Sequence, residues 1–234
     1  MPSVKPILVV LGATGNQGGS ILSYFLSLQS SGTSPYTLRG ITRDPTSEKS
    51  TKLSTQGVEM IGADINNPTT LTAAFKGATA IYSVTNFWQN VFNPAVREKA
   101  TAIGQGILQF SRDLEAQQNK NIIDAAAKVD TLERFIFSSL PDANKLSGGK
   151  YPDVYHFDGK GIAEEYGRSV YPQLWKKTTV FYAGFYLENF LGPEGGLLRP
   201  KLVCIISLSL PVYIYMYMYM DMIGLNIHPG LNPN

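Results

Sequence analysis

A glycine-rich turn near the N-terminus constrains the fold more than any other feature of the sequence. Residues 12–18 read Gly-Ala-Thr-Gly-Asn-Gln-Gly and directly follow an apolar run, Ile7–Leu11. The first glycine permits a tight turn, the second lets the backbone approach a pyrophosphate, and the third lets the next helix pack against the strand. The exposed N–H groups of that helix then bind phosphate. The sequence predicts a dinucleotide-binding domain, although a glycine-rich turn without a ligand would show the same pattern.

Apolar strands and amphipathic helices alternate along most of the chain. The expected strands are Ile7–Leu11, Tyr36–Thr42, Val58–Ala63, Ala78–Val84, Arg134–Ser138 and Thr178–Tyr182. The expected helices are Ser20–Gln29, Ser47–Gln56, Pro68–Phe75, Asn121–Val129 and Gly159–Ser169. This alternation predicts an α/β fold with a Rossmann-type, doubly wound parallel sheet and right-handed crossovers.

Composition fits a folded protein in a reducing compartment. Hydrophobic residues make up 44% of the chain and charged residues 16%, which is enough for a sizeable core. The formal net charge is +2, without a basic run, so direct nucleic-acid binding is not expected. The single cysteine, Cys204, cannot form an internal disulfide, and no signal peptide precedes the first strand. We expect a cytoplasmic or nuclear protein without a metal site.

The end of the second strand indicates which dinucleotide is bound. NAD-binding folds usually place an acidic residue there, to hold the ribose 2′-hydroxyl. Here the strand ends in Thr42-Arg43-Asp44-Pro45, and Arg43 could instead hold a 2′-phosphate through two charge-assisted hydrogen bonds. Ser47 and Lys49 follow closely and could contribute. Asp44 precedes a proline, which favours a turn residue. These residues favour NADP(H) over NAD, although Arg43 could also be an ordinary surface arginine.

Five separate blocks of the sequence resemble the NmrA-like family, whose members are atypical relatives of the short-chain dehydrogenases/reductases. The resemblance covers roughly residues 5–192. The blocks are Gly12–Gly19, Ile41–Pro45, Val84–Trp88, His156–Lys160 and Tyr186–Phe190.

The resemblance implies that the chain binds NADP(H) through positions spread over the whole domain. Asp64 closes the third strand, where the family contacts adenine, although it could equally be a turn residue. Together with Ser47 and Lys49, the expected cofactor-binding residues are Gly12, Ala13, Thr14, Gly15, Asn16, Gln17, Arg43, Asp64, Thr85, Asn86, Phe87, Lys160, Tyr186, Leu187, Glu188 and Asn189.

The expected catalytic positions depart from the usual pattern. Ordinary short-chain dehydrogenases use Tyr-x-x-x-Lys, in which the tyrosine transfers a proton and the lysine lowers its pKa. Lys160 is present here, but His156 stands four residues earlier, and Tyr155 is out of register by one. His156 could exchange protons or be a loop histidine without a catalytic role. Ser138 and Ser139 end the fifth strand, near the place of a reactive hydroxyl in the family, or they are simply a polar strand end.

Three hypotheses of function follow. The family's regulatory members lack the tyrosine and are thought to sense NADP(H), so the chain could be a cofactor sensor that acts on a protein partner such as a transcription regulator. Alternatively, it is an NADPH-dependent reductase of a small carbonyl or enone substrate, with Lys160 and His156 in its active site. The third hypothesis is a truncated product without stable function.

Two segments fit the resemblance poorly. Family members continue well past Asn189 into a smaller lobe, so we expect an NADP-binding domain at residues 1–192 with an incomplete second lobe, then an aberrant apolar tail at 193–234. Residues 202–220 carry no charge and include a Tyr/Met alternation. Such a run predicts aggregation and could be translated non-coding sequence, or less readily a membrane anchor. The polar segment from about Asn93 to Asn119 could be an inserted loop or a gene-model error, with helical stretches such as Val96–Gln105.

Overall fold

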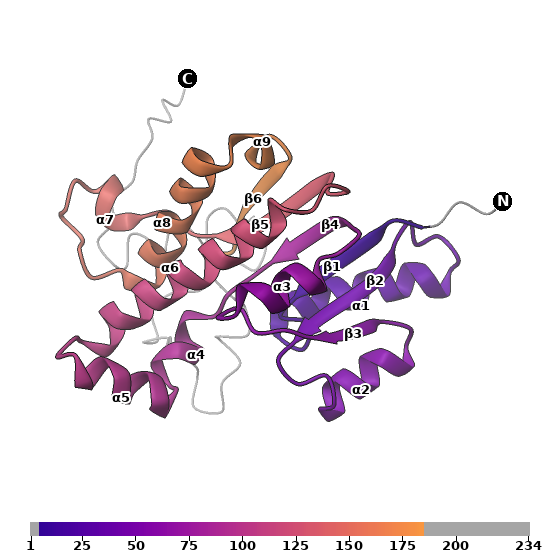
Figure 1. The fold of residues 1–234 in the computed structure, drawn as a ribbon, viewed down its shortest axis with the longest axis horizontal. Helices are drawn as coiled ribbons and strands as arrows, with labels where there is room; N and C mark the ends of the chain where they lie inside the picture. Colours follow the sequence, from indigo (N-terminus) through magenta and orange to yellow (C-terminus); the bar gives the residue numbers. More distant parts are fainter. Residues whose placement is uncertain (1–4, 185–234) are drawn as a thin grey trace, which may run out of the picture.

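A parallel sheet of six strands forms the centre of the computed structural model, which describes residues 5–184 (Figure 1). The strand order is β3-β2-β1-β4-β5-β6. This arrangement confirms the predicted doubly wound α/β fold. The strands are β1 (Ile7–Leu11), β2 (Thr37–Thr42), β3 (Glu59–Gly62), β4 (Ala78–Ser83), β5 (Arg134–Ser139) and β6 (Thr178–Tyr182).

Helices cover both faces of the sheet. One hydrophobic cluster joins the sheet to α1 and α2, and a second joins it to α3, α6, α8 and α9. The helices are α1 (Asn16–Ser30), α2 (Glu48–Thr55), α3 (Pro68–Ala74), α4 (Phe87–Val91), α5 (Pro94–Ala102), α6 (Ile107–Ala126), α7 (Ala143–Leu146), α8 (Tyr155–Val170) and α9 (Pro172–Trp175).

The central strand β1 shows why its sequence is continuously apolar. Leu8 and Val10 pack into the cluster on the α1 and α2 face, whereas Val9 and Leu11 pack into the cluster on the opposite face. Side chains alternate along a strand, so a strand that is covered on both faces needs apolar residues at every position.

The strand order reverses between β1 and β4. From β1 the chain proceeds outward to β2 and β3, then crosses back to β4 and continues to β5 and β6 on the other side. Helices that follow β1 and β4 therefore leave on opposite faces, and the carboxyl ends of these strands border a crevice. Ligands of doubly wound folds bind at this switch point.

Two predicted helices begin too late. The helix α1 starts at Asn16 rather than at Ser20, and α8 starts at Tyr155 rather than at Gly159. The first turn of α1 carries polar residues and glycines, so apolar periodicity becomes clear only later in the helix. The first turn of α8 holds the buried Phe157, which packs in a small cluster with Ala143 and not in the main core.

The predicted helix at Asn121–Val129 was wrong in its bounds. Those residues contain only the end of α6, which runs from Ile107 to Ala126. Most of the polar segment from about Asn93 to Asn119 is therefore helical. Within it, α5 covers much of the stretch Val96–Gln105 that was expected to be helical. A local signal for α5 was present, because Asn93 caps the helix and Pro94 follows at its first position.

No helix within residues 5–184 is long and apolar enough to cross a membrane. The proposed boundary at residue 192, the second lobe and the 193–234 tail all lie outside the described residues.

Candidate functional site

A cavity of about 880 Å³ opens at the carboxyl ends of the strands, at the switch point of the sheet. Its walls come from the glycine loop, from the ends of β2, β4 and β5, and from α4, α6 and α8. Of the residues singled out from sequence, those that line it are Gly12, Thr14, Gly15, Asn16, Gln17, Gly18, Arg43, Thr85, Asn86, Phe87, Ser138, Ser139, His156 and Lys160.

The glycine loop presents the N-terminus of α1 to this cavity. Gly12 has a φ of 62°, the left-handed region that glycine tolerates best, and Gly15 N donates to Gly12 O at 2.9 Å to close the turn. No described side chain caps α1, and its first turn holds no acidic residue. The positive end of the helix dipole thus faces the cavity without a protein counter-charge. Ala13 is buried in the core instead of lining the cavity.

Gly18 is required by close packing of α1 against β1. A Cβ at this position would lie 2.6 Å from Leu11 O and 2.7 Å from the carbonyl carbon of Gly12. Both are backbone atoms, so neither can move aside by changing a rotamer. The absence of a side chain at residue 18 therefore sets how closely the helix N-terminus approaches the strand.

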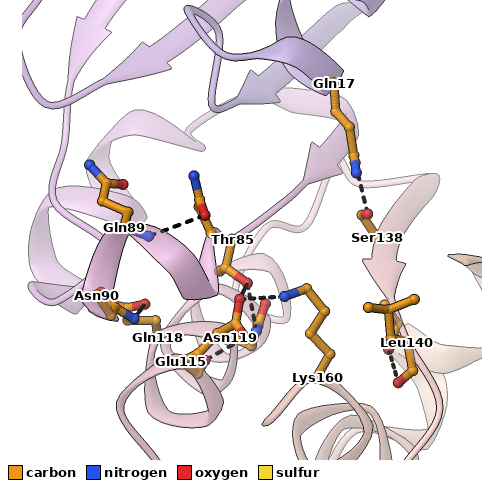
Figure 2. Close-up of polar contacts among 12 residues, drawn as sticks. Gln17, Thr85, Gln89, Asn90, Glu115, Gln118, Asn119, Ser138, Leu140 and Lys160 are labelled. Atoms are coloured by element: carbon orange, nitrogen blue, oxygen red, sulfur yellow. Dashed lines mark hydrogen bonds and ion pairs between the residues drawn. The ribbon is translucent and has the colours of Figure 1, made fainter. Parts of the chain in front are cut away.

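Gln17 ties the loop to the centre of the sheet. Its Oε1 accepts hydrogen bonds from Tyr82 Oη at 2.6 Å and from Ser138 Oγ at 2.8 Å, the latter drawn in Figure 2. These contacts link α1 to β4 and β5. The Ser138 hydroxyl therefore forms a structural hydrogen bond. The hydroxyl of its neighbour, Ser139, donates to Leu140 O at 3.4 Å.

Arg43 lies at the end of β2 with its exposed side chain at the cavity wall. Within residues 5–184 it forms no salt bridge. The carboxamide of Gln89 lies against its guanidinium. With the amide oxygen turned toward Arg43, Gln89 accepts from Nη1 at 2.9 Å and also from Nη2. A neutral partner leaves the positive charge available to an anion.

Asp44, the acidic residue next to Arg43, forms hydrogen bonds within a turn. Asp44 Oδ1 accepts from the backbone N of Thr46 at 2.8 Å and from Thr46 Oγ1 at 2.6 Å, and these bonds lower the pKa of its carboxyl. Ser47 caps α2, and Lys49 is exposed. Neither Ser47 nor Lys49 is among the residues that line the cavity.

Asp64, at the end of β3, likewise forms a turn. Its Oδ1 accepts from the backbone N of Asn66 at 2.9 Å, and its neighbours Ala63, Ile65 and Asn66 line the cavity although Asp64 does not. Asn66 Oδ1 accepts from Gln118 Nε2 at 3.0 Å. The cavity wall at the end of β3 is therefore formed by apolar and amide side chains and not by this carboxylate.

The segment after β4 lines one end of the cavity. Thr85 is buried beneath it, Asn86 caps α4 by accepting from Gln89 N at 3.3 Å, and the buried Phe87 packs its ring 5.9 Å from that of His156. Trp88 remains half exposed beside the same imidazole, with ring centroids 5.6 Å apart. This end of the cavity is thus largely aromatic.

Lys160 takes part in a buried polar network, which is drawn in Figure 2. Its Nζ donates to Glu115 Oε1, and the same oxygen accepts from Thr85 Oγ1 at 2.8 Å. Asn119 Nδ2 donates to Thr85 Oγ1 at 2.9 Å. Sequence reasoning missed Glu115 and Asn119. They could have been found from their helical spacing with the apolar Ile122 and Ala126, because a charged residue on such a stripe is unusual.

His156 is held neutral at the start of α8. Burial lowers its pKa to about 4, and the nearby Lys160 charge contributes in the same direction. An imidazolium is therefore a minor species in the folded protein at neutral pH. Tyr155 does not take the missing tyrosine's place, since it is not among the lining residues and its Oη donates to Asp153 Oδ1 at 2.9 Å.

We expect His156 to make folding stability depend on pH below neutrality. In the unfolded chain it binds a proton near pH 6.5, whereas the folded protein resists protonation down to about pH 4. Stability should fall as the pH drops through this window, by about 2 to 3 kcal/mol at pH 4.5. Urea unfolding at pH 7 and pH 4.5 should show a smaller loss for His156→Gln than for the wild type. Equal losses would contradict a buried neutral imidazole.

The predicted positions Tyr186, Leu187, Glu188 and Asn189 lie outside the described residues. Among residues 5–184, no group of three or more His, Cys, Asp or Glu side chains is arranged to hold a metal ion.

Comparison with known proteins gives a consistent family assignment. The model of the NmrA-like family matches residues 4–203. The NmrA-like family domain-containing oxidoreductase FrzB of a Cladobotryum species is 31% identical, over 80% of this chain and 49% of its own length. The corresponding oxidoreductase hkm9 of Aspergillus hancockii is 29% identical, over 83% and 50%. The chain thus spans about half the length of the curated relatives it matches.

Solved structures share the fold. NmrA, a negative transcriptional regulator solved in complex with NADP, superposes with a TM-score of 0.56 at 22% identity, covering 82% of this chain and 52% of NmrA. The triphenylmethane reductase of a Citrobacter species, complexed with NADP(H), gives a TM-score of 0.52 at 20% identity, covering 78% and 51%. One of these two proteins is described as a regulator and the other as a reductase.

Proposed function

The chain belongs to the NmrA-like family, and on that basis we propose that it binds NADP(H) at the glycine loop and acts as a sensor of this cofactor. The relatives support a nicotinamide dinucleotide, because NmrA was solved with NADP and also with NAD, and the triphenylmethane reductase with NADP(H). The sensing role would be exerted through a protein partner, such as a transcription regulator, in the cytoplasm or nucleus.

The residues present fit a dinucleotide. Gly12, Gly15 and Gly18 bring backbone to the cavity wall, and a Cβ at Gly15 would lie only 3.3 Å from Gly12 O. The N-terminus of α1 would hold the pyrophosphate, Arg43 the 2′-phosphate, and Lys160 the hydroxyls of the nicotinamide ribose. When bound, NADPH supplies a hydride donor; the chain supplies binding, orientation and the environment of the reacting end.

The neutral state of His156 is the observation that favours a sensor over a reductase. Reduction of a carbonyl needs a proton donor beside the hydride. His156 stands where ordinary short-chain dehydrogenases have their tyrosine, and its pKa of about 4 leaves it without the acidic imidazolium proton at pH 7. The nearby hydroxyls of Ser138 and Ser139 donate to protein acceptors.

We expect NADPH binding without turnover. Calorimetry should detect saturable binding of NADPH, while absorbance at the nicotinamide wavelength should stay constant across a panel of aldehydes, ketones and enones. Steady NADPH oxidation with a member of this panel, absent from a heat-denatured control, would contradict the sensing role and leave cofactor binding intact.

A second candidate function is an NADPH-dependent reductase. It is favoured by the two most similar relatives reported above, which are both named oxidoreductases, and by the presence of Lys160. If turnover is found, Lys160→Met should abolish most of it. A variant with full activity would exclude Lys160 from the reaction.

A further inference from the structure

Three elements converge behind the wall of the cavity to hold one carboxylate. Thr85 follows β4, Glu115 and Asn119 belong to α6, and Lys160 belongs to α8. All four side chains are buried, and Glu115 and Asn119 are completely inaccessible. Thr85 and Lys160 line the cavity, whereas Glu115 and Asn119 do not. Glu115 therefore contacts the cavity only through its two partners.

The direction of each hydrogen bond in this network is determined. Asn119 Nδ2 lies 3.1 Å from Glu115 O, a backbone acceptor, so the amide must present its nitrogen on that side. The same nitrogen donates to Thr85 Oγ1, which leaves the hydroxyl proton of Thr85 for Glu115 Oε1. The threonine and the lysine thus both donate to one carboxylate oxygen.

The backbone of α8 is adapted to this pair. A Cβ at Gly159 would lie 2.9 Å from Arg112 O, so glycine at this position lets α8 approach α6 closely. Lys160 is the next residue, and the close approach brings its ammonium to Glu115. The close packing of α8 on α6 therefore depends on Gly159, and the ion pair with Glu115 depends on the next residue, Lys160.

A purely stabilising role explains this arrangement poorly. Burying two opposite charges costs much of what their attraction returns, and apolar residues often do as well. In addition, Glu115 Oε2 and Asn119 Oδ1 are buried without a hydrogen-bond partner in the described part of the chain. Groups that are left incompletely satisfied in this way often mark a functional constraint.

We propose that Glu115 is a positioning residue, which holds the Lys160 ammonium at the cavity wall in the orientation that binds the nicotinamide ribose. The inference rests on the proposed binding of NADP(H) and adds a residue that never touches the cofactor. Thr85 and Asn119 fix the carboxylate, and the carboxylate fixes the ammonium.

Other charged groups near Lys160 are engaged elsewhere. His156, one turn earlier on α8, stays neutral across pH 7 to 9 because its pKa is about 4. Glu164, one turn later, accepts from Arg168 and from Tyr182. On α6, Arg112 pairs with Asp113. Asp158 Oδ1 faces the backbone N of Asn144. Glu115 is thus the carboxylate that pairs with Lys160 in the described structure.

The test is a double-mutant cycle read as a pH profile. NADPH affinity is measured from pH 7 to pH 9 for the wild type, Glu115→Gln, Lys160→Met and the double variant. In Glu115→Gln the ammonium is buried without a counter-charge and loses its proton more readily, so affinity should fall about tenfold or more across this range. Wild-type affinity should change less than about threefold, and Lys160→Met should be weak and independent of pH.

The double variant keeps the test decisive if Glu115→Gln folds poorly. It carries no unpaired charge, so its melting temperature should exceed that of Glu115→Gln. A glutamine at position 115 can still accept from Thr85, so the loss in Glu115→Gln should arise through Lys160, and the double variant should bind NADPH within about twofold of Lys160→Met. Weaker binding by the double variant, or a Glu115→Gln pH profile that parallels the wild type, would overturn the proposal.

A measurement without cofactor separates this inference from the proposed function. In protein labelled with 15N-lysine, one buried ammonium signal should be present in the wild type, absent in Lys160→Met and lost by pH 8 in Glu115→Gln. An unchanged signal in Glu115→Gln would refute the pairing role. A wild type that shows the signal but fails to bind NADPH would refute the proposed function instead.

Discussion

Gly18→Ala should destabilise the fold and nearly abolish dinucleotide binding. The added Cβ would meet Leu11 O at 2.6 Å, so α1 must move away from β1. Such overpacking against backbone should cost about 3 kcal/mol, or roughly 6 to 12 °C in melting temperature. Loss of two or more phosphate hydrogen bonds at the displaced helix N-terminus should weaken NADPH binding by about 100-fold or more. Thermal unfolding and calorimetry measure the two effects.

Gly19→Ala is the matched control. The same methyl group one residue later would lie 3.5 Å from Ala13 O, an ordinary van der Waals distance. Alanine is also the better helix former, so this variant should be as stable as the wild type or more stable by roughly 0.5 to 1 kcal/mol. Similar damage from both substitutions would show that the close approach at Gly18 is not the cause.

Arg43→Ala should weaken binding of NADP and NADPH but not of NAD. A charged hydrogen bond contributes about 1.5 to 3 kcal/mol, so the affinity for NADP should fall by roughly 10- to 150-fold. Because Arg43 is exposed and pairs only with the neutral Gln89 amide among the described residues, the fold should tolerate its loss. Calorimetric titration of the three dinucleotides measures the discrimination directly.

Lys49→Ala provides the control for Arg43. It removes a nearby positive charge from an exposed position that does not line the cavity, and should change NADP affinity by less than about threefold. If Arg43→Ala weakened NAD and NADP equally, Arg43 would not distinguish the 2′-phosphate. If Lys49→Ala had the larger effect, Lys49 and not Arg43 would be the residue that holds the 2′-phosphate.

The parts of the fold that sequence predicted well are those where local chemistry determines structure. Six strands were expected and six occur within residues 5–184, because β1 is covered on both faces and is continuously apolar, and β2, β4 and β5 also bury apolar residues in the two clusters. The glycine loop was predicted because Gly12 and Gly18 are needed for a positive φ and a close approach. Neither requirement depends on distant residues.

The parts that sequence missed depend on contacts between distant elements. The first half of α6 buries polar residues such as Ser111, Glu115 and Gln118, so it lacks the apolar stripe by which a helix is recognised. Glu115 becomes meaningful only beside Thr85 and Lys160, which are 30 and 45 residues away in the chain. The role of Ser138 similarly depends on Gln17, 121 residues earlier.

The most direct test of the account is an NMR titration of the 15N-labelled protein with NADPH. The cofactor should bind at the N-terminus of α1, so the largest amide shifts should occur at Gly15, Asn16 and Gly18, with a second set at Arg43. Shifts confined to a shallower surface hollow beside α5, lined by residues such as Phe92 and Arg97, would place the ligand elsewhere. That result, or no shifts at saturating NADPH, would contradict the central claim.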